Sequence, residues 1–195
     1  MARITDPKRL ENIKESTISL IVEQGYGEAS IAAIAAKAGV ADGYLYRHYP
    51  SKASLVSDLF GESAAIIFQH INDKLDNYTS FENFVISYLE GLVTIINERP
   101  NNAKFFIQLF NDYTFKIESH IKIEIETFCK RLIEKGLENN EISADTSIVD
   151  AYTILMIIPL QIFGLYLKGF FGLHEISTSE IATSISKTCM KIVKK

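Results

Sequence analysis

The chain has 195 residues, of which 47% are hydrophobic, and a formal net charge of −4 at pH 7. That length can bury a core in one large domain or two small ones, and the hydrophobic content with low net charge excludes a disordered chain. The two cysteines, Cys129 and Cys189, are sixty residues apart without a metal-binding spacing. We therefore expect no metal site, no disulfide framework and no cofactor.

Apolar residues recur at helical spacing along nearly the whole chain. A first helix is predicted to end at Gly25. A short helix follows, with Ser30 as its N-cap, and ends at Gly39, a residue that tolerates left-handed dihedral angles. A second short helix is predicted from Ala41 to about His48.

Longer helices follow in the rest of the chain. Ser51 is expected to cap a long helix, and Thr79 with Glu82 has the spacing of a capping box that opens a helix closed by Pro100. Further helices are predicted at residues 105–113, 117–137, 145–171 and 178–193. Because no alternating strand pattern and no repeat occur, the fold class is predicted as all-α, with about nine helices.

The last third of the chain contains an uncharged run at residues 151–167. It is shorter than the roughly 20 apolar residues of a membrane span and contains Pro159 and Gln161, so a buried helix or an oligomer seam is the better interpretation. Ser177 and Glu180 have capping-box spacing and are expected to open the last helix. The protein is expected to be cytoplasmic.

The two short helices and the turn at Gly39 form a predicted helix-turn-helix, a motif whose second helix enters the major groove of DNA. Leu45 and Tyr49 are four residues apart and share the face expected to pack inward. Gly43 costs about 1 kcal/mol of helix stability relative to alanine, so some other requirement is expected to favour glycine here. Close approach of the helix backbone to a DNA strand is one such requirement. The side chains expected to project outward are Asp42, Gly43, Tyr46 and Arg47.

Residues 10–60 resemble the DNA-binding domain of the TetR family of bacterial transcriptional regulators. The resemblance is carried by Ser30, by "AGV" at residues 38–40 and by "GYLYRHYPSKASL" at residues 43–55. It implies a DNA-binding domain at residues 1–52 and a ligand-binding and dimerisation domain at residues 53–195. Two positions depart from the family pattern: Ala41 replaces a capping serine, and Tyr44 replaces a small residue.

The resemblance also implies how individual residues contact DNA. Ser30, Tyr46 and Lys52 are expected to bind phosphates, which fix register without reading sequence. Alternatively, Tyr46 is a core aromatic and Lys52 a solvated charge. Residues 1–52 have seven Lys and Arg against six Asp and Glu, so nonspecific affinity for DNA is expected to be modest, with Arg3, Lys8 and Arg9 helping as an N-terminal arm.

Base readout is expected from the second short helix. Arg47 could bind a guanine edge, unless it is a solvated charge, and Tyr44 a thymine methyl group. His48 is expected to contact a phosphate or a base, or to pack. Asp42 suits a cytosine amino group or a capping role, and Gly43 allows the close approach.

The remainder of the chain is expected to pair two protomers and to bind an effector. The family implies a homodimer, formed by helices near residues 148–171 and 178–193, that reads a near-palindromic double-stranded DNA operator; core packing is the alternative. The expected pocket for a hydrophobic or aromatic small molecule, with filled core again the alternative, comprises Tyr88, Phe106, Phe110, Tyr113, Phe128, Tyr152 and Met156.

The predicted function is that of a ligand-responsive transcriptional regulator, a repressor released from its operator by the effector. No catalytic motif is present in the sequence, so no catalytic residue and no enzyme activity are expected. Two alternatives remain open: a helical small-molecule-binding protein with a degenerate helix-turn-helix, supported by Asp42 and the weak basic balance, and a transcriptional activator.

Overall fold

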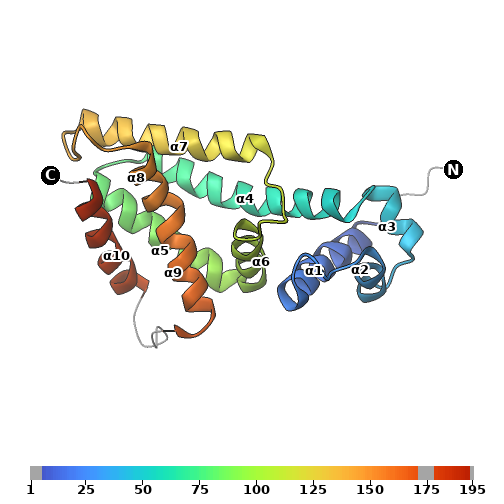
Figure 1. Ribbon diagram of the computed structural model, residues 1–195. Coiled ribbons are helices and arrows are strands. Elements are labelled where there is room, and N and C mark those ends of the chain that lie inside the picture. The colour runs from blue at the N-terminus through green and yellow to red at the C-terminus, as the bar shows by residue number, and fades with distance from the viewer. Residues whose placement is uncertain (1–5, 171–177, 194–195) are drawn as a thin grey trace. The chain divides into compact units, whose positions relative to one another are not determined.

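The protein is all-helical in a computed structural model that describes residues 6–170 and 178–193 (Figure 1). Every regular element within these residues is a helix, and none is a strand. The helical segments Ile148–Tyr152, Thr153–Ile157 and Ile158–Leu167 follow one another without a break and count as one helix. The described residues therefore form nine continuous helices. The predicted all-α class and the predicted number of helices are confirmed.

The chain divides into two compact units. The first contains the described residues up to Ala64 together with Asn101–Glu118, and the second contains Ala65–Pro100 and the described residues from Ser119 onward. This division differs from the predicted boundary after residue 52, because the first half of the long helix and a later segment join the first unit. Whether residues 1–52 and 53–195 are separate functional domains stays a prediction.

The first unit contains the three N-terminal helices, the start of a long helix and a short later helix. Gly39 ends the second helix with a φ of 68°, and the side chain of Ser30 accepts a hydrogen bond from the backbone N–H of Ala33 at 3.1 Å. Both predicted boundaries of this helix are therefore confirmed. The elements are α1 (Pro7–Gln24), α2 (Ile31–Ala38), α3 (Asp42–His48), α4 (Lys52–Asp76) and α6 (Pro100–Phe110).

Aliphatic and aromatic side chains fill the interior of this unit. Ile13, Ile34 and Leu45 are fully buried, one from each of the first three helices. The ring of Phe60 on α4 stacks on Phe106 of α6, with ring centroids 4.8 Å apart. These short helices would not be stable alone, and burial of these apolar groups stabilises them.

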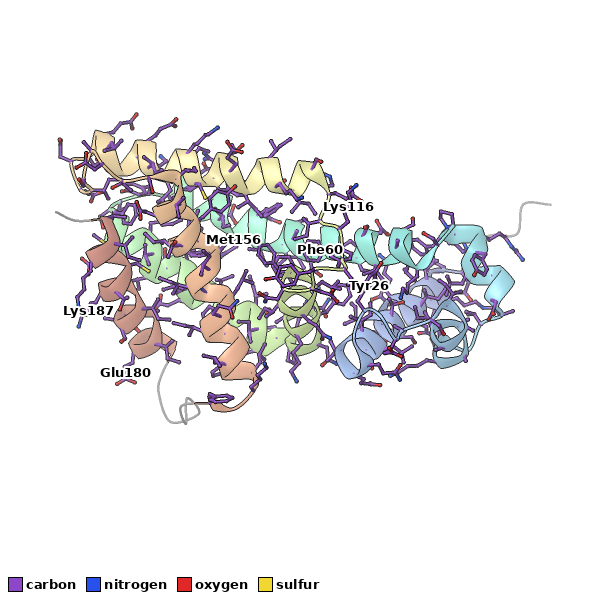
Figure 2. The ribbon with its side chains drawn as sticks, viewed as in Figure 1. Tyr26, Phe60, Lys116, Met156, Glu180 and Lys187 are labelled. Atoms are coloured by element: carbon purple, nitrogen blue, oxygen red, sulfur yellow. The ribbon has the colours of Figure 1, made fainter. Side chains whose placement is uncertain are left out.

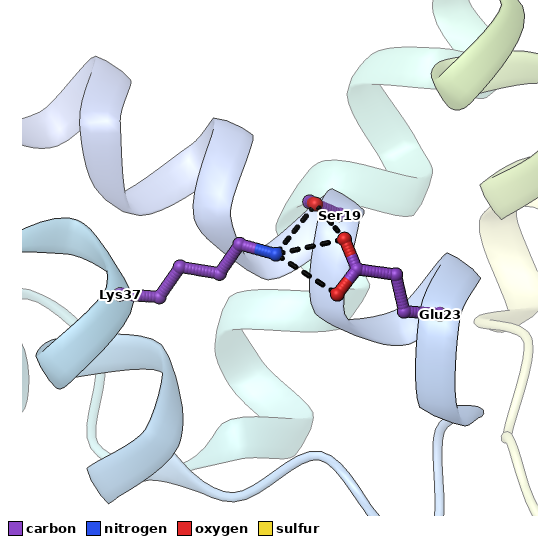
Figure 3. Close-up of polar contacts among 3 residues, drawn as sticks. All are labelled: Ser19, Glu23 and Lys37. Carbon is purple, nitrogen blue, oxygen red and sulfur yellow. Dashed lines mark hydrogen bonds and ion pairs between the residues drawn. The ribbon is translucent and has the colours of Figure 1, made fainter.

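A polar contact braces α1 against α2 at the surface of the first unit (Figure 3). The ammonium group of Lys37 donates to the Ser19 hydroxyl at 2.7 Å and to both carboxylate oxygens of Glu23 at 2.8 and 3.0 Å. These hydrogen bonds, from Lys37 first and Ser19 second, lower the pKa of the Glu23 carboxyl. The brace fixes the orientation of α2, the first helix of the helix-turn-helix.

The second unit is a bundle formed by the later part of α4 and the remaining helices. The guanidinium group of Arg131 on α7 donates to Asn72 at 2.5 Å and to Asp76 at 2.9 Å, both on α4. These hydrogen bonds join the two long helices, whose ribbons run side by side in Figure 1. The last helix packs against α5. The elements are α5 (Phe81–Glu98), α7 (Ser119–Glu138), α8 (Ile148–Tyr152), the π-helix η1 (Thr153–Ile157), α9 (Ile158–Leu167) and α10 (Thr178–Val193).

Several helix starts differ from the predictions. The N-cap of α5 is Ser80, which accepts from the backbone N–H of Asn83, so the predicted capping box of Thr79 and Glu82 is wrong by one residue. The capping box that does form joins Ser147 to Asp150 at the start of α8.

Two more boundaries were expected elsewhere. Helix α6 begins at Pro100 rather than near residue 105, since proline suits the first turn of a helix. Ser177, in the second predicted box, lies outside the described residues.

The helix of the uncharged run has a π-helical segment just before Pro159. Pro159 has no N–H to donate to the carbonyl of Leu155 four residues earlier, and its ring crowds that carbonyl. The buried hydroxyl of Tyr88 on α5 donates to the Leu155 oxygen at 2.7 Å instead. The wider turn and the tyrosine together accommodate the proline.

The segment Ile148–Leu167 is long and apolar enough to cross a membrane by length and composition alone, with a mean hydropathy of 1.9. One face is nevertheless buried inside the second unit, where Ile154, Leu155 and Phe163 are at most 3% exposed. A core helix of a bundle passes the same test of length and composition, and the burial supports that interpretation.

Replacing Glu141 with alanine is expected to destabilise the second unit. One carboxylate oxygen of Glu141 accepts from the hydroxyl of Tyr78 at 2.5 Å and from the backbone N–H of Phe81 at 3.0 Å, at the start of α5. Losing both partners should lower the free energy of unfolding by about 1–3 kcal/mol, measured by urea denaturation. Glu138→Ala, at an exposed position on α7, serves as the control, and an equal effect of the two variants would contradict the assigned role.

Candidate functional site

Helix α3 turns one side chain fully inward and exposes most of the others. Leu45 has no exposed surface, so it fixes the rotation of the helix about its axis. Tyr44 and His48 are half-buried at the edge of the exposed face. The outward set is the one predicted from the sequence: Asp42, Gly43, Tyr46 and Arg47 are exposed, with Tyr46 at 55%.

The start of α3 is weakly stabilised. Its N-cap is Ala41, which makes no side-chain hydrogen bond, whereas Asp42 places a negative charge in the first turn, where the helix dipole favours it. A Cβ atom added at Gly43 would meet no described atom within 4 Å. Packing within the described chain therefore does not require glycine at this position.

Tyr44 gathers cationic and aromatic groups around its ring. The His48 ring lies 5.0 Å away, and the guanidinium carbons of Arg47 and Arg9 lie over the ring at 6.0 and 5.7 Å from its centre. The Tyr44 hydroxyl oxygen is buried and has no hydrogen-bond partner among the described residues. The pairing with Arg47 and His48 follows from helical spacing, but Arg9 comes from α1, and no sequence spacing indicates that contact.

Lys52, predicted to bind phosphate, is already bonded within the protein. Its ammonium group donates to the backbone carbonyls of Tyr26 at 2.7 Å and Gly27 at 3.3 Å, and it lies 4.5 Å from the centre of the Tyr26 ring. The Tyr26 ring, labelled in Figure 2, in turn makes an edge contact with the ring of Phe115. Lys52 therefore holds the loop between α1 and α2 against the start of α4.

Two further residues near α3 have structural partners. Ser30, predicted to bind phosphate, is exposed and uses its hydroxyl oxygen as the N-cap of α2. Tyr49 is half-buried and donates to Asp58 at 3.0 Å. Burial, followed by this hydrogen bond, raises the pKa of Tyr49 to about 12, so its hydroxyl stays protonated at neutral pH.

Residues 13–59, which contain this helix-turn-helix, match the family model for bacterial regulatory proteins of the tetR family. This stretch is similar to the DNA-binding domain of the TetR family. The predicted resemblance is thereby confirmed for the N-terminal unit. In a helix-turn-helix the second helix is the one that enters the major groove of DNA, and α3 has that position in this chain.

Known TetR-type regulators share the fold over nearly the whole chain. A regulatory protein of the tetR family from Rhodococcus RHA1 is 17% identical, with a TM-score of 0.75 and coverage of 97% of this chain and 98% of that one. FadR from Bacillus subtilis, solved with stearoyl-CoA, is 15% identical, with a TM-score of 0.70 and coverage of 94% and 99%. These likenesses confirm the two-part helical architecture.

A curated relative matches part of the chain. The fatty acid metabolism regulator protein of Bacillus subtilis (strain 168) is 29% identical over 117 residues, which are 60% of this chain. The match covers 53% of the relative, so the chain spans about half the length of the curated relative that it matches.

Four of the seven residues predicted to bind an effector lie in the second unit. Tyr88, Phe128 and Met156 are at most 4% exposed, and Tyr152 is half-buried (Met156 is labelled in Figure 2). Tyr88 reaches Leu155 next to Met156, so α5 and η1 meet at this point. Burial raises the pKa of the Tyr88 hydroxyl, which therefore remains a hydrogen-bond donor.

The other three predicted effector residues lie in the first unit. Phe106 is buried and lies 6.0 Å from the half-buried Phe110, whereas Tyr113 is fully exposed and does not line an interior. The structure thus brings Phe106 and Phe110 together but leaves Tyr113 apart from them. Sequence spacing alone could not reveal this, because Tyr113 follows the end of α6.

Helix α10 has a polar outer face. A surface hollow of about 290 Å³ lies along it, lined by Ser179, Glu180, Thr183, Ser184 and Lys187 (Glu180 and Lys187 are labelled in Figure 2). The apolar stripe of the helix, including Ile181 and Ile185, is buried within its own unit. A polar hollow of this kind does not suit a hydrophobic effector.

Replacing Gly43 with alanine is expected to raise stability and to weaken DNA binding. Alanine should gain up to about 1 kcal/mol in a helix, and the site has room for the methyl group, but that group would separate the backbone of α3 from a DNA strand. Gly61→Ala is the matched control, since this α4 position also has open space. The two variants should show similar thermal stability, and only Gly43→Ala should lose affinity in a gel-shift assay. Unchanged affinity would show that DNA does not approach Gly43.

Proposed function

We propose that the protein is a ligand-responsive transcriptional repressor that binds a near-palindromic operator as a homodimer. The observation that carries this proposal is the exposed Arg47 on a recognition helix whose rotation is fixed by the fully buried Leu45. Arg47 makes no ion pair within the described part of the chain, so its guanidinium group is available for the edge of a guanine in the major groove.

A homodimer follows from the small size of the DNA-reading unit. One seven-residue recognition helix contacts too few base pairs for useful specificity, so two copies must bind successive major grooves. The proposed dimer interface lies on the helix Ile148–Leu167, where the apolar side chains of Val149 and Ile157 are 63% and 53% exposed. The apolar stripe of α10 contributes less, because it packs against α5.

The proposed effector is a hydrophobic molecule, and a fatty-acyl thioester is the first class to test. Two observations support this class: the relatives include a fatty acid metabolism regulator and a FadR bound to stearoyl-CoA, and the second unit has an apolar, aromatic interior. Helix α4 is continuous and contributes residues to both units. An effector that shifts α4 would change the spacing of two recognition helices and lower affinity for DNA.

Cytoplasmic location and the absence of catalysis belong to the same proposal, since regulators of this family act on DNA. The two thiols of the chain are poor nucleophiles, because burial raises the pKa of Cys129 to about 12 and of Cys189 to about 11. Both thiols remain protonated at neutral pH and serve as core groups.

Selection of bound DNA from a random pool is expected to enrich a near-palindromic sequence. Arg47→Ala should then lower the preference for one base pair per half-site by roughly 5–150-fold, in line with the about 1–3 kcal/mol of a bidentate contact. Competition gel shifts measure this preference. Arg99→Ala, at an exposed position in the second unit, is the control and should retain the wild-type preference.

The selection also separates the regulator from the alternative of a small-molecule-binding protein with a degenerate helix-turn-helix. That alternative rests on the balance of only +1 in residues 1–52 and on Asp42, which would repel phosphate. If no sequence is enriched even at low salt, the proposal of a repressor fails. Enrichment followed by activation in a transcription assay would instead support an activator.

Stearoyl-CoA is expected to release the protein from the selected DNA. The acyl chain should enter the apolar interior, so micromolar stearoyl-CoA should lower DNA affinity at least tenfold in a fluorescence anisotropy assay, whereas coenzyme A without an acyl chain should have no effect. Calorimetry shows whether stearoyl-CoA binds. Binding without a change in DNA affinity would contradict the proposed coupling, and lack of binding would exclude the long-chain acyl thioester as effector.

A further inference from the structure

The ring of Tyr44 is the meeting point of two arginines from different helices. Arg47 is three residues later on α3, with its guanidinium carbon 6.0 Å from the ring centre, and Arg9 on α1 has its guanidinium carbon at 5.7 Å. Both distances are within the range of cation–π attraction. One aromatic side chain thus restrains two cations whose backbones are far apart in the sequence.

Arg9 has a second restraint that leaves its end groups open. Its Nε atom lies 3.3 Å from a carboxylate oxygen of Asp6, while 59% of its side chain is exposed. Asp6 is itself fixed, because it caps α1 by accepting from the backbone N–H of Lys8 at 3.1 Å. With Nε facing Asp6, the two terminal NH₂ groups of Arg9 can bind a phosphate in bidentate fashion.

The contribution of Tyr44 comes from its ring. Its hydroxyl oxygen is buried and lacks a hydrogen-bond partner in the described part of the chain. The hydroxyl therefore gives the free protein no hydrogen bond, whereas the ring contacts Arg9, Arg47 and His48. A small residue at this position, as is usual in the family, could not restrain either arginine.

We propose that Tyr44 is a positioning residue that sets the base preference of α3. Its ring holds Arg47 toward a base edge and holds Arg9, together with Asp6, toward a backbone phosphate of the same half-site. This inference rests on the proposed function, because it requires that the exposed face of α3 binds duplex DNA. In this proposal Arg9 binds a phosphate and so fixes the position of the protein along the DNA, whereas Arg47 reads a base. Tyr44 couples these two contacts because its ring restrains both arginines.

The experiment compares Tyr44→Phe, which keeps the ring, with Tyr44→Leu, which removes it. Each full-length variant is titrated against the DNA selected by the wild-type protein and against single-base variants of that DNA, at several salt concentrations. Tyr44→Leu should lower the preference for the base pair that Arg47→Ala affects by at least fivefold, and Tyr44→Phe should retain it. Thermal denaturation checks that both variants fold, and Tyr44→Phe is expected to be at least as stable as the wild type.

Arg9 is tested with Arg9→Gln against Lys8→Gln, which removes the same charge from the neighbouring residue. Arg9→Gln should weaken binding to all sequences alike and lower the slope of log affinity against log salt by about 1 per half-site. The effect of Lys8→Gln should be the same with and without the Tyr44 ring, because no described contact joins Lys8 to Tyr44. In the Tyr44→Leu background, Arg9→Gln should have a smaller effect than in the wild type.

Three results would overturn the inference. One is an unchanged base preference in Tyr44→Leu, and another is a loss in Tyr44→Phe as large as in Tyr44→Leu, which would assign the role to the hydroxyl. The third is an effect of Arg9→Gln on the salt dependence that is as large in the Tyr44→Leu background as in the wild type. If the wild-type protein enriches no sequence, the proposed function itself fails, whereas enrichment with any of these three results removes only the role of Tyr44.

Discussion

Burial of Leu45 determines what α3 can present to a partner. A helix of seven residues is too short to be stable in water, so α3 exists because its apolar side chain packs into the first unit. With Leu45 inside, helical geometry places Tyr46 and Arg47 outside, regardless of any other contact. The left-handed conformation of Gly39 sets the turn from α2, so the direction of α3 and its rotation about its axis are both fixed locally.

Polar contacts then secure the elements on which α3 rests. Lys37 joins α2 to α1, and Lys52 joins the loop between these helices to the start of α4. Lys14 likewise pairs with Glu62 on α4, so at least three of the seven cations in residues 1–52 serve the fold, and specificity depends on where the others are held. Placement, more than total charge, distinguishes base readout from general attraction to phosphate.

The sequence predicted what is local and missed what depends on partners distant in the chain. Ser30, Gly39 and Leu45 follow from capping, left-handed dihedral angles and helical spacing, and the structure has them as predicted. Lys52 was predicted as a free cation, because nothing in its spacing indicates that the Tyr26 carbonyl lies within reach.

The same limit applies to the second unit. Pro159 is visible in the sequence, but nothing in its spacing indicates that the Leu155 carbonyl, inside the π-helical segment, is bonded by the hydroxyl of Tyr88 from a helix about seventy residues earlier. The predicted capping box at Thr79 failed for a different reason, since Thr79 and Ser80 are both suitable N-caps and only the backbone decides between them.

Departures from local helix rules gather on the outer part of α3. Ala41 leaves the N-cap without a side-chain hydrogen bond, Gly43 weakens the helix where nothing described would obstruct a methyl group, and the Tyr44 hydroxyl is buried without a partner. Each departure costs stability, which the charge of Asp42 in the first turn and the ring contacts of Tyr44 offset only in part. Such costs persist in natural proteins where a site serves function instead of folding. The proposed DNA contact, in which the backbone of α3 approaches DNA closely and Tyr44 holds Arg47 and Arg9 in place, would account for Gly43 and Tyr44 together.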